Sequence, residues 1–578
     1  MTGDPPHPAG PGERTASAAA DQRAVRDAAD QYVASLAGLD PLLATMLGLP
    51  EGQDRLPDLS PSGQQAKDDL ARATLARLGE LTPAGADERR CARLLAERLA
   101  AGLAVSEAGE HLRDLRNIFG PVNRVRNIFL LMPAATPDDW AVIARRMAQV
   151  PAAFAGQRAS LAEGARRGLL TAPRQVRTVV DQLTEWEAAA DGRGWFAGFC
   201  AAADVPPALR AELDRAAAGA MSAAGSLRDW LATGYLPQAD GTPDAMGEDR
   251  YRTGARQWTG ADIDPAEAYD WGWSEFQRLR AEAAQQAELV QPGASAQEAM
   301  RYLDAHGEAV EGVAEIQQRL QQLMDDTIAE LGRTQFGIPE PVRRVEARIA
   351  PEGSAAAPYY TRPSQDFSRP GRTWLPTLGK TRFPLWSLVS TWYHEGVPGH
   401  HLQLAQWTYL SGELSAFQTS AASVAACSEG WALYAERLMD ELGYLTDPGA
   451  RLGYLDAQLM RAVRVVIDIG MHLGLAVPGD SPLGAGQAWT PELGGDFLAA
   501  HSGLSRAFVD SEIVRYLGSP GQAISYKLGE RAWLAGRAAA RQAHQARGEP
   551  FDLAAWHSAA LSLGVLGLDD LADELARL

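Results

Sequence analysis

The sequence predicts a mostly α-helical protein organised in two lobes. Hydrophobic residues make up 46% of the chain, alanine is abundant, and apolar residues recur at helical spacing over many stretches. The chain has 578 residues, more than the roughly 250 to 300 at which a single core stops growing. We therefore expect a disordered tail over residues 1–20, a helical N-terminal lobe over 21–335 and a second lobe over 336–578 that carries the chemistry.

Charge and cysteine content narrow the class of protein. The formal net charge is −19, and no basic stripe is available to neutralise phosphates, so we expect neither nucleic acid nor a membrane as partner. Cys91, Cys200 and Cys427 are odd in number and far apart, which indicates reduced, buried thiols. Because the first residues lack a continuous apolar segment and no apolar run reaches about 18 residues, we expect a cytoplasmic protein.

Amphipathic helices are predicted in order along the first half of the chain. Proline-containing breaks such as Leu131-Met132-Pro133 separate them, and this half contains no chemical motif. The predicted helical stretches are 24–47, 64–81, 87–105, 137–165, 173–191, 206–233 and 265–331.

The pattern changes to strands after Gly337. Residues 344–349 alternate apolar and charged side chains at period two, which predicts a strand. Residues 358–360 and 372–375 are further strand candidates, separated by a polar loop that contains glycine and proline. A small sheet is therefore expected before the next helix.

A histidine-rich segment follows this sheet. In the zinc-binding motif HExxH, two histidines four residues apart on one helical face bind the metal, and the glutamate acts as a general base. Here the position four after His394 is Pro398, and the next histidines are His400 and His401. In an unbroken helix these would lie roughly 9 to 10.5 Å along the axis from His394, too far to share one zinc ion.

A break in the helix would remove that obstacle. Proline removes an amide donor, and glycine adopts backbone angles closed to other residues, so a bulge at Pro398-Gly399 could bring His400 beside His394. The alternative is a kinked helix with ordinary polar histidines. Three histidines and Glu395 within eight residues favour the metal site.

The motifs of this half resemble a known family. The run HEGVPGHHLQ over 394–403, with SEGWALYAE over 428–436, resembles the bacterial domain-of-unknown-function family 885. Similar patches at 464–472 and 520–529 extend the resemblance over roughly 340–535. The resemblance implies a helical fold like the thimet oligopeptidase and angiotensin-converting-enzyme group of gluzincin zinc peptidases. It also implies a small antiparallel sheet beside the metal helix, whose edge either pairs with a peptide substrate or only braces the helices.

A catalytic zinc ion usually takes three protein ligands and keeps a fourth position open. With His394 and His400 as two ligands, the resemblance implies Glu429, 29 residues after His400, as the third. The alternative role for Glu429 is an acid that stabilises a helix N-terminus. Glu436, two turns further on, is either a neighbour of the ligands or solvated.

The remaining catalytic roles follow from the same resemblance. Glu395 is expected to act as the general base, and Tyr526 to stabilise the oxyanion. His401 could replace His400 as ligand or orient the substrate.

Four further residues are predicted to surround the ligands or to contact substrate. Asp468 and His472 share one helical face, and we expect Asp468 to accept a hydrogen bond from a ligand histidine and His472 to contact substrate. Arg515 and Lys527 could bind a substrate carboxylate. A structural or surface role remains the alternative for each.

Departures from the family pattern bear on the substrate. The chain has Asp468-Ile469-Gly470 where the family typically has Asp-Thr-Gly, and the loop 475–482 is rich in glycine and proline. The ligands are intact, so we expect a specialised substrate such as an amino-acid conjugate.

The predicted function is a zinc-dependent hydrolase that cleaves an amide bond in short peptides or amino-acid conjugates. One alternative is a metal-dependent enzyme on a non-peptide substrate, for instance with iron in the same ligand set. The other is a catalytically idle helical binding protein, against which the presence of Glu395 counts.

Overall fold

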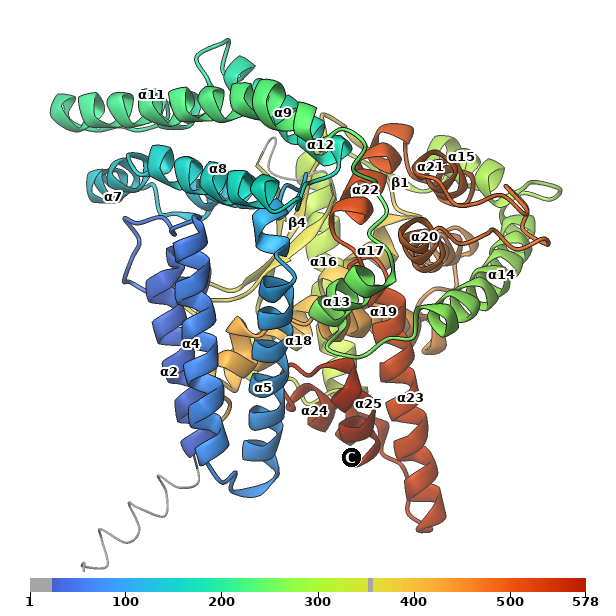
Figure 1. The fold of residues 1–578 in the computed structure, drawn as a ribbon. Coiled ribbons are helices and arrows are strands. Elements are labelled where there is room, and N and C mark those ends of the chain that lie inside the picture. Colours follow the sequence, from blue (N-terminus) through green and yellow to red (C-terminus); the bar gives the residue numbers. More distant parts are fainter. Residues whose placement is uncertain (1–22, 352–356) are drawn as a thin grey trace, which may run out of the picture.

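The computed structural model describes residues 23–351 and 357–578, and it is mostly helical with two small sheets (Figure 1). The predicted mostly α-helical class is confirmed. The tail predicted for residues 1–20 lies outside the described residues.

The N-terminal part contains two groups of helices. Helices α2, α4 and α5 run side by side, and α7, α8, α9 and α11 lie across one end of them (Figure 1). Capping residues in the sequence mark where helices begin. In α4, for example, the Ser60 hydroxyl accepts a hydrogen bond from the Gly63 amide, and Pro61 is the first helical residue. The elements are α2 Ala24–Leu39, α3 Pro41–Leu47, α4 Pro61–Glu80, α5 Gly85–Glu107, η1 Glu110–Arg113, α6 Pro121–Asn127, η2 Ile128–Leu131, α7 Pro137–Met147, α8 Val150–Arg166, α9 Pro173–Ala188, α10 Trp195–Cys200, α11 Pro207–Trp230, η3 Leu231–Tyr235, α12 Leu236–Ala239 and α13 Glu248–Thr259.

The remaining helices surround the histidine-rich segment. Helix α14 packs along α20, and α19 packs along α23. The second pair approaches very closely, because a Cβ added at Gly529 would lie 2.0 Å from the Ala426 carbonyl oxygen. The helices are α14 Pro265–Val290, α15 Ala296–His306, α16 Val313–Thr334, η4 Glu340–Arg343, α17 Leu388–Glu395, α18 His400–Tyr409, η5 Phe417–Ala421, α19 Ala425–Glu441, α20 Pro448–Leu473, α21 Pro491–Ala500, α22 Arg506–Gly518, α23 Ser525–Ala546, α24 Leu553–Leu561 and α25 Leu568–Ala576.

Three clusters of buried apolar side chains form the core. One cluster lies within residues 42–239, and the largest one extends from Tyr251 to Leu575. A third joins α2 and α5 to side chains near the histidine-rich segment, including Trp407 and Cys427. The predicted lobe boundary at residue 335 therefore does not coincide with a boundary between clusters, since residues 251–335 pack with the C-terminal half.

The strands form where the alternating pattern predicts them, but their directions differ from the expectation. A three-stranded sheet has the order β2-β4-β3, with β2 parallel and β3 antiparallel to β4. The expected antiparallel sheet is thus wrong for β2. Strand β3 pairs with the other edge of β4, so β2 pairs directly with β4, which runs in the same direction. A separate two-stranded sheet pairs β1 with β5. The strands are β1 Ala309–Glu311, β2 Val345–Ile349, β3 Tyr359–Thr361, β4 Gly371–Leu375 and β5 Arg382–Pro384.

The close contact of α19 with α23 gives a test of the fold. We expect Gly529→Ala to lower the free energy of unfolding by about 1 to 3 kcal/mol, because the new methyl group would overlap the backbone of α19. Chemical denaturation measures the change.

The matched control is Gly225→Ala in α11, where an added Cβ meets nothing within 4 Å. This variant should be neutral or more stable by about 0.5 to 1 kcal/mol, since alanine favours a helix over glycine. Equal stability of the Gly529→Ala variant and the wild type would contradict the close helix contact.

Candidate metal centre

The candidate centre begins at the break between α17 and α18. Helix α17 ends at Glu395 and α18 begins at His400. The Gly399 amide donates to the Tyr393 carbonyl at 2.9 Å, so the chain folds back on the last turn of α17. A Cβ at Gly399 would lie 2.0 Å from the His394 carbonyl oxygen, so no larger residue fits there.

A tryptophan holds this turn against the next helix. The indole nitrogen of Trp431 in α19 donates to the carbonyl oxygens of Pro398 and Gly399 at 2.9 and 3.1 Å. Trp431 is fully buried. The turn is therefore fixed to the helix that carries Glu429.

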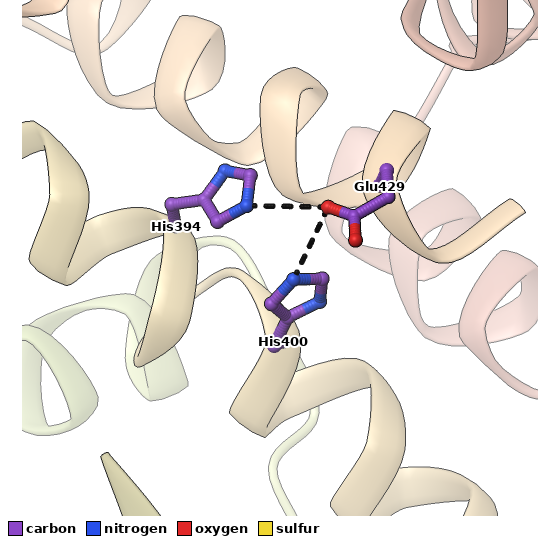
Figure 2. Close-up of side chains that lie close together, drawn as sticks. All are labelled: His394, His400 and Glu429. Carbon is purple, nitrogen blue, oxygen red and sulfur yellow. Dashed lines mark ion pairs between the residues drawn. The ribbon is translucent and has the colours of Figure 1, made fainter. Parts of the chain in front are cut away.

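Three side chains from three helices converge at this turn. Donor atoms of His394, His400 and Glu429 all lie within 4.8 Å of one another. Figure 2 shows both imidazole rings directed at one carboxylate oxygen of Glu429, at 3.4 Å from His394 and 3.5 Å from His400. The break brings together two histidines that an unbroken helix would separate.

A second carboxylate lies behind His394. Nδ1 of His394 is 2.7 Å from Glu436, which also accepts a hydrogen bond from Ser390 at 2.8 Å. An ionised carboxylate only accepts, so Nδ1 carries a proton, and Nε2, 3.4 Å from Glu429, is the nitrogen that a metal ion would take once its own proton is lost. Such contacts orient the imidazoles of metal sites.

The protonation states respond to these carboxylates. Burial alone would lower the pKa of His394, but hydrogen bonds to Glu429 and Glu436 outweigh it and raise the pKa to about 9. Burial alone would raise the pKa of Glu429, but the charges and hydrogen bonds of the two histidines hold it well below its usual value. A dication would interact with the same ionised carboxylate.

Glu395 differs from the other two glutamates. Its pKa is raised, chiefly because burial disfavours the ionised form and also because Glu429 is close. Its carboxylate makes no hydrogen bond with any described residue. A carboxyl group whose pKa is shifted towards neutrality suits proton transfer.

The donor set fits a metal ion. Two imidazole nitrogens and one carboxylate are a common ligand set of catalytic zinc, and here their ligand atoms face one point. Nε2 of His394 and Nε2 of His400 lie 3.4 and 3.5 Å from the same oxygen of Glu429. These separations are large enough for an ion to be bound between the three atoms.

The side chain of His401 is directed away from the cluster of His394, His400 and Glu429. Its Nε2 donates to the Val342 carbonyl at 2.7 Å, and its Nδ1 accepts from the Tyr360 hydroxyl at 3.0 Å. Burial lowers its pKa to about 4. The structure thus brings His400 and not His401 to the cluster, while His401 connects α18 to strand β3.

Tyr526 lies beside the cluster, at the start of α23. The guanidinium carbons of Arg461 and Arg464 are 5.9 and 5.0 Å from its ring centre. Its pKa is raised, first by burial and then by the nearby charge of Glu429, so the hydroxyl keeps its proton near neutral pH.

The structure gives Arg515 and Lys527 buried partners. Arg515 donates to both oxygens of Glu512 and to Gln522. The Lys527 ammonium contacts Glu275 at 2.9 Å and also Glu530. Neither cation is available for a substrate carboxylate, so this prediction is corrected.

Asp468 does not accept from a ligand histidine as expected, whereas the substrate contact of His472 stays a prediction. Asp468 accepts from the Tyr251 hydroxyl at 2.8 Å and from the Gly521 amide at 3.0 Å, and Nε2 of His472 donates to the Tyr516 carbonyl at 3.2 Å. Both lie near the C-terminal end of α20. Asp468 connects this helix to α13 and to the loop before α23, and His472 connects it to α22. Glu436 makes the contact that was expected of Asp468.

Sequence reasoning missed three residues near the centre. Ser390 had no signal, because a lone serine in a helix is common. Arg461 and Arg464 had one: two arginines in the otherwise apolar stretch 459–467 are costly to bury without partners.

Comparison with known proteins now places the chain. Residues 41–575 match the family described as "Bacterial protein of unknown function (DUF885)". The chain belongs to this family. The DUF885 match covers the N-terminal helices as well as the histidine and glutamate motifs, and no curated protein matches the chain.

Two solved structures have a fold similar to that of this DUF885 chain. A candidate lipoprotein from Colwellia psychrerythraea is similar with a TM-score of 0.82 and 22% identity, over 96% of this chain and 99% of that one. A candidate lipoprotein of unknown function from Shewanella oneidensis has a TM-score of 0.70 and 18% identity, over 95% and 98% of the two chains. At these identities the similarity concerns the fold alone. Among the described residues, no helix is long and apolar enough to cross a bilayer.

The contact between Glu436 and His394 gives a second test. We expect Glu436→Gln to weaken zinc binding by about 10- to 100-fold, because the uncharged amide orients and polarises the imidazole less well. Competition with a chromophoric chelator measures the affinity.

Glu441→Gln on the same helix is the matched control, because Glu441 pairs with Arg437 and Arg537 away from the histidines. It should bind zinc as the wild type does. Wild-type affinity in the Glu436→Gln variant would contradict a role of Glu436 in holding His394.

Proposed function

We propose that this chain is a zinc-dependent hydrolase that cleaves an amide bond in short peptides or amino-acid conjugates. The observation that carries the proposal is the convergence of His394, His400 and Glu429 within 4.8 Å beside Glu395. Two histidines, one carboxylate and an adjacent general base form the minimal set for metal-assisted hydrolysis. When bound there, zinc would polarise the substrate carbonyl and lower the pKa of water.

The protein's own groups supply the proton transfers. Glu395 accepts a proton from the attacking water as the new C–O bond forms at the amide carbon. The C–N bond then breaks, and Glu395 returns the proton to the leaving nitrogen, so that an acid and an amine result. The raised pKa of Glu395 matches it to both steps.

Tyr526 is the proposed donor to the carbonyl oxygen. Its hydroxyl makes no hydrogen bond with the described residues and keeps its proton because its pKa is raised. A donor that is already in place as negative charge develops on the oxygen lowers the barrier.

The fold is proposed to work as in two-lobed helical zinc peptidases. Strand β3 forms an edge of the three-stranded sheet, and its residue Tyr360 contacts His401, which follows His400. This edge strand is therefore close to the proposed ligands, and an edge strand is the kind of element to which an extended peptide adds.

Metal content tests the ligand assignment. Wild-type protein should hold about one zinc ion per chain, and His394→Ala, His400→Ala and Glu429→Ala should lose it, because zinc at a catalytic site needs three protein ligands. Elemental mass spectrometry counts the ions and also separates zinc from iron.

His401→Ala is the control, because His401 is an equally buried neighbour with both ring nitrogens bonded elsewhere. It should keep the metal, with folding checked by circular dichroism. A wild type that takes up no added zinc would overturn the proposal and favour a binding protein.

Glu395→Gln tests the chemistry separately from the metal. We expect this variant to keep its zinc while kcat for short peptides falls at least 100-fold, because the amide cannot accept the proton of water. Mass spectrometry of a peptide library identifies the products. Unchanged turnover in this variant would exclude Glu395 as the general base.

A further inference from the structure

A guanidinium beside the candidate centre has no hydrogen-bond partner among the residues that the structure describes. Arg461 lies on α20, and its side chain is only 11% exposed. Its Nε is buried and unpaired, and no described residue accepts a hydrogen bond from the group. Its closest ionic contact is Glu436, at 3.5 Å.

This arrangement is costly unless another anion completes it. A guanidinium offers five donors, and buried donors without acceptors cost free energy. Glu436 meets this demand only in part, because one guanidinium nitrogen approaches it, at 3.5 Å, while its oxygens also accept from His394 and Ser390 at 2.7 and 2.8 Å. Arg461 thus has donors left for a ligand.

The neighbouring arginines are more completely paired than Arg461 among the described residues. Arg464 donates to Glu512 at 2.8 Å and to the Tyr516 hydroxyl at 2.7 Å. Arg515 binds the same Glu512. Two guanidinium groups therefore share one carboxylate, and neither of them relies on Glu436.

Arg461 is also close to the reacting groups. Through Glu436 it is joined to His394 by contacts of 3.5 and 2.7 Å, and it lies over the ring of Tyr526 at 5.9 Å. One residue of extended chain spans about 3.3 to 3.6 Å, so the group that Arg461 would bind is placed about one residue from the scissile bond in the proposal below.

We propose that Arg461 binds a carboxylate of the substrate, about one residue beyond the scissile amide, with Tyr526 beside it. The inference rests on the proposed hydrolase function and makes it specific for acidic substrates. The carboxylate is either the free C-terminus of a short peptide or acylated amino acid, or the side chain of an aspartate at that position. Arginine suits this role because its planar donors bind a carboxylate in bidentate fashion.

Matched substrates test the proposal. Short peptides that the zinc-loaded enzyme cleaves are compared as free acids, as C-terminal amides, and as amides with aspartate in the last position. Wild type should prefer a carboxylate-bearing form by about 10- to 100-fold in kcat/KM over the neutral amide, the range expected for hydrogen bonds to a charged group. Preference for the free acid identifies the C-terminus, and preference for the aspartyl amide identifies the side chain.

Arg461→Gln should reduce this preference to nearly one, read as the ratio of kcat/KM for the two substrate forms, so that any general loss of activity affects both forms alike. Arg451→Gln on the same helix is the control, since Arg451 pairs with Asp440 and should keep the preference. Glu436→Gln should have the opposite pattern to Arg461→Gln. It should bind zinc more weakly and keep the preference for the carboxylate-bearing substrate. Loss of zinc in Arg461→Gln with an unchanged preference would show that Arg461 serves only Glu436 and would overturn the proposal.

Binding to zinc-free protein gives a readout independent of activity. N-acetyl-phenylalanine should bind more tightly than its amide by isothermal titration calorimetry, and Arg461→Gln should abolish the difference. Equal binding of acid and amide by the wild type, together with equal cleavage, would overturn the carboxylate site while leaving the hydrolase intact. A wild type without zinc uptake or amide cleavage would instead remove the proposed function, and calorimetry would still report on Arg461.

Discussion

The candidate centre depends on one backbone feature, the turn between α17 and α18. The turn is held by a hydrogen bond from the Gly399 amide to the Tyr393 carbonyl. The indole nitrogen of Trp431 adds two more, to the carbonyls of Pro398 and Gly399. Gly399 is required because any side chain would overlap the His394 carbonyl. The turn shortens the distance between His394 and His400, and the same tryptophan fixes it to α19, which carries Glu429. Three helices therefore meet at one point through a single anchored turn.

Buried charge around this turn is arranged in two groups. In one, Glu436 accepts from His394 and Ser390 and contacts Arg461. In the other, Glu512 is shared by Arg464 and Arg515. Removing ionised groups from water costs several kcal/mol each, so their presence is expected only where partners or a ligand repay it. The first group has acceptors satisfied and donors left over, and this imbalance is the basis for expecting an anionic substrate.

Sequence patterns predicted local structure well and contacts between distant segments less well. Alternation over 344–349 predicted β2, and proline with glycine predicted the break after Glu395. The pairing of β2 with β4 could not be predicted, because it depends on which edge of β4 the intervening strand occupies. The i, i+4 spacing of Asp468 and His472 indicated a shared face but not which neighbour that face meets.

The sequence by itself determined the helical class and, through residue type and short-range spacing, a metal-binding motif around His394 and Glu395. Its resemblance to DUF885 implied Glu429 as a further ligand and left His400 and His401 as alternatives. Only the tertiary structure decided that His400 joins the cluster while His401 faces away, which carboxylate contacts His394, and that Arg515 and Lys527 have several buried partners while Arg461 has one ionic contact, to Glu436, among the described residues. These depend on how α19, α20 and α23 pack, and such packing is set by contacts between segments tens to hundreds of residues apart.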